Sequence, residues 1–509
     1  MESNAKRGMY NVLFGALGQL ATIIVGLLVP RFILVNLGSE QNGLLSSIQQ
    51  ILVYLALLEM GVGAATTQAL YQPVGAGDRN GISGILCATD RYYKRTGLIY
   101  FLILLVIALG YPLVVEVGIP YLWVVLVVLF SGMPSVLAYF FQAKYKLLLK
   151  VEGKSYIITN ISTITTVLIS AAKIVLLNLG CNVVIVQLSY MLLSFLQVLY
   201  FAAYIHKHYK WLNLKSEPNE KAISQKGSAL VHQVTALIFS NTDMLILTLF
   251  SGLNTVSVYS MYNMVFTMVK TAINTVNSSV YFSMGQAYAN NKARFMRMHD
   301  LFEVCNMALT FALYSIAAIF VLPFLEIYTD GVHDIQYIQR WLPLAFIATF
   351  LLDDGRVSSL QVILYAGKFK ETTRQAVIEA VINIVVSLAA VRFLGIYGVL
   401  AGTAAALLYR TNDMIIYTAK ELLHRSPIIT YRRWLRNLAV FVAVIILAGQ
   451  VVPQHFTGYV PMVLWAAVVS LLVIPIFFLV SLLLEPGLVG ILKEILVPYV
   501  RKMKKILKR

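Results

Sequence analysis

Residues 460–484 read VPMVLWAAVVSLLVIPIFFLVSLLL and contain no ionisable side chain. In an α-helix, 25 residues rise about 37 Å at about 1.5 Å each, which exceeds the roughly 30 Å hydrocarbon core of a bilayer. The backbone finds no water there, so its polar groups must bond internally, as they do in a helix. The segment is therefore predicted to cross a membrane as a helix that could face lipid on all sides.

Similar apolar stretches recur along nearly all of the 509 residues. The chain is 59% hydrophobic and 12% charged, whereas a soluble chain carries about 25% charged residues. Hydropathy and charge clusters predict an all-α integral membrane protein with about fourteen transmembrane helices, or twelve if two weak neighbours form one broken helix. The expected spans are residues 10–35, 43–70, 96–116, 121–143, 156–178, 182–205, 228–250, 256–283, 301–325, 338–365, 372–392, 396–418, 437–453 and 460–484.

Basic residues alternate from one predicted loop to the next. Thirty-three of the forty lysines and arginines lie on one side, and the alternate loops contain none. This bias places both termini in the cytoplasm. It also accounts for the net charge of +17 through anionic lipid, without nucleic acid. The basic tail, residues 488–509, is either an amphipathic helix on that face or a stop-transfer charge cluster.

Three glycine-containing turns recur at nearly constant offsets. Gly38 matches Gly252 and Gly153 matches Gly367, both 214 residues apart, and Leu179-Gly180 matches Leu394-Gly395 at 215. A repeat of six helices begins each copy on the same side, so the two bundles are parallel and pseudo-symmetric. The expected divisions are a six-helix lobe at 1–210, a second at 211–425, two extra helices within 426–485 and the tail at 486–509.

Several classes of site are not supported. The cysteines at positions 87, 181 and 305 lack metal or disulfide spacing, and Gly75-Ala-Gly77 is not followed by a P-loop lysine. The loops are too short for a separate catalytic domain. We predict no enzyme, no catalytic residues, no metal and no cofactor.

Ionisable residues within the spans cost about 2.5–3.5 kcal/mol each in hydrocarbon, so they are expected to face partners or water. These candidates are Arg31, Glu59, Lys173, Asp243, Lys270, Asp353, Asp354, Arg356, Glu379, Arg410 and Asp413. Helical spacing arranges polar residues in four stripes: Thr159, Thr163, Thr166, Ser170 and Lys173; Asn263, Lys270, Asn274 and Asn277; His232, Ser240 and Asp243; and Thr403, Arg410, Asp413 and Tyr417. They line either a hydrated cavity between the lobes or hydrogen-bonded helix contacts. Asp353–Arg356 and Arg410–Asp413 are (i, i+3) neighbours that could pair.

Four short segments resemble the polysaccharide-transport branch of the multidrug/oligosaccharidyl-lipid/polysaccharide exporter superfamily. They are residues 31–43, with Leu37-Gly38 and Asn42-Gly43; Leu58-Glu59-Met60-Gly61-Val62-Gly63; Asn241-Thr242-Asp243; and Val256-Ser257-Val258-Tyr259. The resemblance implies a flippase that moves undecaprenyl-diphosphate-linked oligosaccharide to the outer leaflet of the bacterial cytoplasmic membrane by alternating access. Membrane lipids, a polysaccharide polymerase and glycosyltransferases are the other implied partners.

The same resemblance implies roles for particular residues. Headgroup contacts are expected from Arg31, Lys173, Lys270, Arg356 and Arg410. A sodium or proton coupling set is expected from Asp243, Glu379, Asn383 and Thr403. Polar cavity positions are Glu59, Asn263, Asn274, Asn277 and Asp413. A lipid II flippase and a cation-coupled drug exporter of the same superfamily remain alternatives, and a membrane-embedded glycosyltransferase is disfavoured by the short loops.

Overall fold

The computed structural model describes residues 4–59, 62–214, 216–220, 237, 241–368, 370–488 and 490. Within these ranges the ordered elements are helices, with no strand. Nine of the described helices are long and apolar enough to span a membrane. Other predicted spans are less apolar helices, such as α10 (Leu253–Asn290) and α15 (Ile396–Tyr417), or helices in two pieces. The all-α, multi-pass fold is confirmed.

The chain forms two compact units. Unit 1 comprises Met1–Val258 and Gly331–Ile335, and unit 2 comprises Tyr259–Asp330 and Gln336–Arg509. The apolar helix Asn241–Phe250 belongs to unit 1, where Thr248 Oγ1 donates to Ser47 Oγ over 2.9 Å. The units therefore divide at a different point from the repeat. The division into two lobes between residues 210 and 211, which follows from the sequence repeat, stays a prediction.

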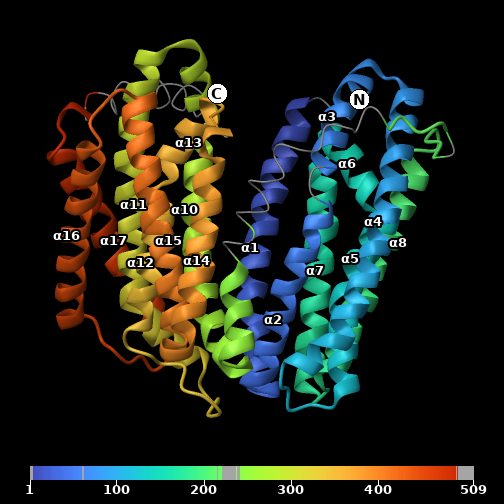
Figure 1. Cartoon of the computed structure of the whole chain (residues 1–509), viewed down its shortest axis with the longest axis horizontal. Coiled ribbons are helices and arrows are strands. Elements are labelled where there is room, and N and C mark those ends of the chain that lie inside the picture. Colours follow the sequence, from blue (N-terminus) through green and yellow to red (C-terminus); the bar gives the residue numbers. More distant parts are fainter. Residues whose placement is uncertain are drawn as a thin grey trace. The chain divides into compact units, whose positions relative to one another are not determined.

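Unit 1 is a bundle of long helices, coloured blue to green in Figure 1. Its elements are α1 (Asn4–Leu37), α2 (Ser39–Leu55), the 3-10 helix η1 (Ala56–Glu59), α3 (Val62–Ala76), α4 (Arg79–Val114), α5 (Tyr121–Phe141), α6 (Ala143–Val151), α7 (Ser155–Asn178) and α8 (Val183–His208). Helix α1 packs on α7, α7 on α8, α8 on α5 and α5 on α4. Buried Tyr93, Tyr100 and Tyr139 form one aromatic core, with the Tyr93 and Tyr139 rings stacked 6.0 Å apart.

Asp334 closes the start of α2 within unit 1. Its Oδ2 accepts the Ser39 backbone N–H over 2.7 Å, and its Oδ1 accepts the Ser39 hydroxyl over 2.5 Å. A carboxylate at a helix N-terminus satisfies free N–H groups and favours the helix dipole. This contact holds Gly331–Ile335 against unit 1, although the chain before and after this segment belongs to unit 2.

Unit 2 is a second bundle of helices. After α10, its elements are α11 (Lys292–Tyr328), α12 (Leu342–Gly355), α13 (Val357–Tyr365), η3 (Lys370–Thr372), α14 (Thr373–Leu394), α15, the π-helix η4 (Thr418–Leu422), α16 (Ile428–Val451) and α17 (Tyr459–Leu483). Phe346 centres its aromatic core, with Tyr262 and Phe266 stacked at ring distances of 5.8 and 5.6 Å.

Some predicted spans differ from the observed helices. Residues 43–70 and 338–365 were each expected as one helix, but the first is divided by η1 and the second at Arg356. Helices α4, α11 and α16 begin 17, 9 and 9 residues earlier than residues 96, 301 and 437, and α6 was not expected. A span predicted from hydropathy ends at the first charged side chains. The helix itself is longer, because its backbone hydrogen bonds continue beyond the hydrocarbon core. The predicted bounds of α7, α15 and α17 hold to within one residue.

Helix α17 does not face lipid all round, as its sequence allowed. Its buried positions form one stripe: Met462, Val469, Val473, Phe477 and Ser481. Their spacing of 7, 4, 4 and 4 residues marks a single helix face, which packs on α11. An apolar sequence without charge cannot distinguish a lipid-facing side from a side packed on another apolar helix. The rest of α17 is exposed, including Leu471 at 75%.

Gly153 and Gly367 end two helices with the same hydrogen-bond pattern. Their φ angles are +71° and +66°. Gly153 N donates to Lys150 O over 3.1 Å and Lys154 N to Leu149 O over 2.8 Å, and the corresponding bonds after α13 measure 3.1 Å each. This is the Schellman arrangement, in which a left-handed residue lets the last carbonyls be satisfied. The sequence repeat at this position therefore reflects a repeated local structure.

Replacing Gly153 or Gly367 by alanine should lower the free energy of unfolding by about 1–2 kcal/mol each, because a left-handed conformation is unfavourable for a residue with a Cβ. Denaturation of the purified protein in detergent would measure the loss. Gly110 in α4 provides the control, since a Cβ there meets nothing within 4 Å and Gly110→Ala should be neutral or stabilising. Equal effects at positions 110, 153 and 367 would contradict the prediction.

A chain of paired charges in unit 2

Six ionisable side chains from five regions of unit 2 form one chain of contacts. We call this set the charge chain: Lys270 of α10, Asp353 of α12, Arg356 between α12 and α13, Glu379 of α14, and Arg410 and Asp413 of α15. Along the chain each cation contacts a carboxylate and each carboxylate contacts a cation, so the set contains three of each. The residues come together because α15 packs on both α12 and α14.

Asp353 joins the first two cations of the charge chain. One of its oxygens accepts a hydrogen bond from Lys270 Nζ, and the other accepts from Arg356 Nη2 over 2.6 Å. Arg356 also donates from Nη1 to Glu379 Oε1 over 2.6 Å. The guanidinium thus bridges two carboxylates through two different nitrogens of its planar fork of donors.

Arg410 completes the charge chain. Its Nε lies 3.6 Å from Glu379 Oε2, and its Nη1 donates to Asp413 Oδ2 over 2.6 Å. Arg410 and Glu379 are buried, whereas the side chains of Lys270, Asp353 and Asp413 are 32%, 20% and 25% exposed. The ends of the charge chain are therefore reachable from outside the bundle and its middle is not.

The break between α12 and α13 positions Arg356 beside its partners. Gly355 immediately precedes it, and a Cβ at Gly355 would lie 2.0 Å from Trp434 Cζ2. Only glycine permits this approach of the Trp434 indole of α16 to the break. Asp354, the residue before Gly355, is bound by α11. The Tyr314 hydroxyl donates to Asp354 Oδ2 over 2.6 Å, and Asn306 Nδ2 donates to the Asp354 backbone oxygen over 3.4 Å.

The predicted polar face of α10 separates into different environments. Asn277 is buried and donates from Nδ2 to Asn306 Oδ1 over 2.6 Å. Lys270 belongs to the charge chain, Asn263 is half-buried and Asn274 is exposed. Asn306 and Tyr314 were not among the expected site residues, because a single Asn or Tyr in an apolar helix gives no distinctive pattern.

Three of the four expected coupling residues lie in unit 2. Asn383 Nδ2 donates to Thr403 Oγ1 over 2.8 Å, one turn along α14 from Glu379. Both Glu379 oxygens face arginines, so a cation there would compete with Arg356 and Arg410. Asp243 is buried in unit 1. The coupling role of the set stays a prediction.

The expected residues of unit 1 lie in separate environments. Glu59 Oε1 accepts the Tyr93 hydroxyl over 3.1 Å. The Lys173 ammonium lies 4.8 Å from the centre of the Tyr190 ring, and among the described residues no carboxylate is within ion-pair distance of it. Arg31 is half-buried in α1.

The polar stripe of α7 has a packing role over part of its length. A Cβ at Gly18 of α1 would lie 2.6 Å from Thr163 Oγ1 and 3.0 Å from Thr159 Cγ2. The threonine end of the stripe therefore contacts α1 closely, as expected of helix packing through small residues. The lysine end is different, because Lys173 contacts an aromatic ring of α8. His232 and Ser240, expected on another stripe, lie outside the described residues.

A second charge cluster, which the sequence did not predict, ties α16 to α11. Arg433 bonds to Glu303 and also donates to Asp300 over 3.1 Å and Glu485 over 2.6 Å. Arg425 bonds to Asp300 and Glu303 as well. Burial opposes the ionisation of Glu485, but hydrogen bonds and charge from Arg433 and Arg436 lower its pKa below the ordinary value.

His299, Asp300 and Glu303 are close enough together to hold a metal ion. Both carboxylates, however, are already bound by Arg425 and Arg433. A cation would have to displace two guanidinium groups, so the arrangement fits an ion-pair cluster.

A family model described as polysaccharide biosynthesis protein matches residues 9–284, more than half of the chain. An inward-facing multidrug resistance MATE family transporter of the MOP superfamily matches with a TM-score of 0.63 and 16% identity, over 79% of this chain and 95% of that one. The lipid II flippase MurJ in an inward closed conformation matches with a TM-score of 0.69 and 13% identity, over 94% and 100%.

At these identities the structural likeness shows the fold. Curated protein sequences give no match. The family model covers most of unit 1 and continues through α10 as far as residue 284, so it includes Arg31, Lys173 and Lys270. The chain belongs to the polysaccharide biosynthesis protein family and has the helical fold shared by the MOP superfamily transporters.

Proposed function

We propose that this protein is a flippase for undecaprenyl-diphosphate-linked oligosaccharide. It turns these units from the cytoplasmic to the outer leaflet of a bacterial cytoplasmic membrane, by alternating access, with both termini in the cytoplasm. The family match and the fold support a transporter of polysaccharide precursors. The charge chain within the membrane-spanning bundle is the observation that carries the proposal. Its cations can bind a charged headgroup at a depth where hydrocarbon cannot solvate one.

A diphosphate headgroup needs cations to replace its hydration. Arginine and lysine provide charge-assisted hydrogen bonds to phosphate oxygens. In the described structure Lys270, Arg356 and Arg410 already bind carboxylates. The headgroup must therefore displace Asp353 or Asp413 from these cations, and the partly exposed ends of the charge chain are where this exchange begins.

The same exchange couples transport to a cation. Protonation of Asp353, or binding of sodium to it, weakens its hold on Lys270 and Arg356 and frees them for phosphate. Loss of the cation restores the ion pairs and expels the headgroup. An ion gradient or the membrane potential, which contributes about 2.3 kcal/mol per charge for each 100 mV, provides the energy. Arg31 and Lys173 of unit 1 are the proposed further headgroup contacts.

The function is tested by depletion in cells and by reconstitution. Depletion should remove a surface polysaccharide while peptidoglycan synthesis continues. In proteoliposomes, a fluorescent undecaprenyl-diphosphate oligosaccharide should become accessible to a membrane-impermeant quencher only when the protein is present. Arrest of peptidoglycan synthesis with lysis would identify a lipid II flippase instead, and energy-dependent dye efflux without lipid movement would identify a drug exporter.

Lys173→Met gives a test that separates binding from folding. Lys173 has no acidic partner among the described residues, so methionine keeps the side-chain length and removes only the unpaired charge. We expect flipping to fall at least about tenfold, since a hydrogen bond to a charged group contributes about 1.5–3 kcal/mol, with thermal stability unchanged or raised. Lys292→Met, at an exposed position of α11, is the control. Full activity of Lys173→Met would remove Lys173 from the site.

A further inference from the structure

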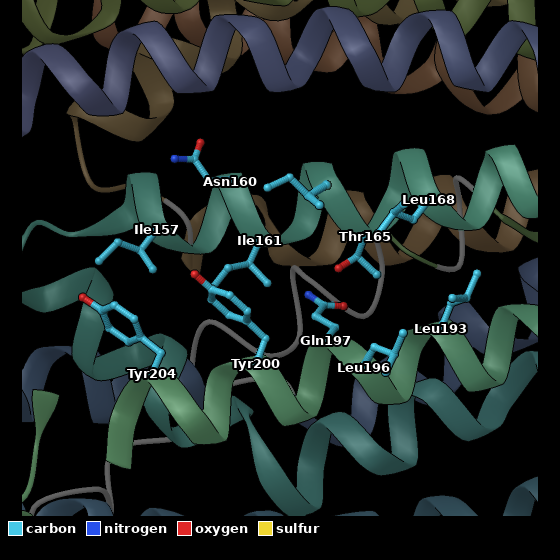
Figure 2. A pocket seen from close by; sticks show the side chains of 11 residues that line it. Ile157, Asn160, Ile161, Thr165, Leu168, Leu193, Leu196, Gln197, Tyr200 and Tyr204 are labelled. Atoms are coloured by element: carbon cyan, nitrogen blue, oxygen red, sulfur yellow. The ribbon is translucent and has the colours of Figure 1, made fainter. Parts of the chain in front are cut away.

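A groove lies between α7 and α8 in unit 1. It has a volume of about 300 Å³, within the usual range of ligand sites. Figure 2 shows its lining side chains projecting from the two neighbouring helices. The lining is mainly apolar, with Asn160, Thr165 and Gln197 among the leucines, isoleucines and tyrosines.

The groove faces away from the polar stripe of α7. On α7 its apolar lining residues are Ile157, Ile161, Ile164 and Leu168, offset by two residues from the stripe that begins at Thr159. Two residues correspond to a rotation of about 200°, so the groove and the stripe occupy opposite faces. Because Thr159 and Thr163 contact α1, the groove lies on the side of α7 away from α1.

The exposure of the lining indicates that hydrocarbon covers this face. Ile164, Leu168 and Tyr200 are 60%, 53% and 58% exposed, although they lie on helices that span the membrane. Large apolar side chains exposed at membrane depth are covered by lipid tails, since water would make their exposure unfavourable.

The groove reaches about half-way through the bilayer. From Ile157 to Leu168 it follows eleven residues of α7, or about 16 Å at about 1.5 Å per residue, against about 30 Å for the hydrocarbon core. It begins near the end of α7 predicted to be cytoplasmic. Its depth is therefore that of one leaflet, which suits the acyl chain of a cytoplasmic-leaflet lipid.

The mouth of the groove carries positive charge. On α8 the lining positions Leu193, Gln197, Tyr200 and Tyr204 step by 4, 3 and 4 residues, and the next steps reach Lys207 and His208. Lys207 is exposed and has no carboxylate within ion-pair distance among the described residues. His208 stacks on Tyr204 with ring centres 4.3 Å apart.

Helix α7 adds a second lysine at the same end. Lys154 lies one turn before Ile157, and its Nζ binds Glu152 over 2.6 Å and the Tyr209 hydroxyl over 2.9 Å. Among Lys154, Lys207 and Glu152 the net charge is +1. The groove therefore combines an apolar channel of one-leaflet depth with a cationic and hydroxyl-bearing mouth.

We propose that this groove holds one anionic phospholipid of the cytoplasmic leaflet, with an acyl chain along α7 and α8 and the phosphate beside Lys207. The proposal rests on the cytoplasmic orientation of this end and not on the identity of the transported molecule. Phosphatidylglycerol matches the chemistry, because it combines a net negative charge with acyl chains.

Native mass spectrometry of the purified full-length protein tests the proposal with dioleoyl phosphatidylglycerol and dioleoyl phosphatidylcholine. We expect one phosphatidylglycerol to be retained about fivefold or more tightly, since one basic residue near an anionic lipid contributes about that factor. Lys207→Glu should remove the preference. The exposed Lys292→Glu of α11, also on the predicted cytoplasmic side, should keep it.

A groove-filling variant tests the acyl-chain contact separately. Ile164→Trp with Leu196→Trp should weaken retention of both lipids at least about tenfold, because each lost methylene contact contributes about 0.8 kcal/mol. Val106→Trp, at a 71% exposed position of α4, should have no effect. Thermal unfolding of each variant confirms that it is folded.

Three outcomes would overturn the proposal. These are equal retention of the two lipids by the unmodified protein, unchanged retention in the folded groove-filling variant, and displacement of phosphatidylglycerol by undecaprenyl phosphate at equal concentration. The last outcome would show that the groove binds the polyprenyl chain of the transported lipid. Because retention is measured without transport, failure here leaves the proposed flippase activity to its own test.

Discussion

Reversing one charge, in Lys270→Glu, should reduce export of surface polysaccharide by at least about a hundredfold. The change places a carboxylate against Asp353, which in the described structure binds Lys270 and Arg356. The like charges repel each other and leave Asp353 with Arg356 as its only cation, and the proposed headgroup contact is lost as well. The export assay is immunodetection of the polymer at the cell surface, with membrane insertion checked by a fluorescent C-terminal fusion.

The charge-swapped protein Lys270→Asp with Asp353→Lys distinguishes a binding role from a structural one. If Lys270 serves the headgroup, the swap should restore protein levels but leave export low, because the cation has moved and Arg356 keeps only Glu379 as a carboxylate partner. Export at the normal level from the swapped protein would show that the pair serves only to hold α10 on α12. Swapping Lys368 and Glu371, an exposed pair at 2.7 Å, is the control and should change neither quantity.

Arg433→Ala is expected to produce the largest loss of stability, about 3–5 kcal/mol. It leaves Glu303, which is 1% exposed, without one of its two arginines, and it also removes the contacts of α16 with Asp300 and Glu485. The buried carboxylate of Glu303, left with Arg425 as its only arginine, causes more of the effect than the lost attraction. Equilibrium unfolding in detergent, followed by tryptophan fluorescence, would measure the change.

The neighbouring arginine provides a matched control for this prediction. Arg432 is exposed, so Arg432→Ala should change the free energy of unfolding by no more than about 0.5 kcal/mol. Replacing Arg433 and Glu303 together by methionine and leucine should cost less than Arg433→Ala alone, because no charge is then left buried without a partner. If the double variant were less stable than the single one, buried charge would not explain the effect.

The sequence predicted the membrane class, most helices and the glycine turns, because these depend on local pattern. The bounds of α7 follow from hydropathy, and the turns at Gly153 and Gly367 from residue type. The short-range pairs Asp353–Arg356 and Arg410–Asp413, which were expected as one alternative, are present. Each of these features involves residues within a few positions of one another.

Contacts between distant residues could not be predicted in the same way. Lys270 and Asp353 are 83 positions apart, and nothing in either helix indicates that they meet. Glu379 was expected to serve a cation, but the neighbouring helix directs Arg410 toward it. The threonines of α7 are the opposite case. Their spacing was compatible with a hydrated cavity or with helix contacts, and in the structure they pack against Gly18 of α1. A single sequence therefore shows that a helix has a polar face, but it does not show whether water or another helix lies against that face.

The equal number of cations and carboxylates in the charge chain sets a condition on stoichiometry. Because the set is electrically balanced, and Asp354 adds a further acidic group beside it, a diphosphate that entered alone would leave an excess of negative charge in a poorly screened interior. Under the proposed coupling, protons or metal ions enter with each headgroup and offset the negative charge that the charge chain itself cannot. Under the proposed function, the current carried per lipid turned over would therefore be smaller than the charge of the lipid itself.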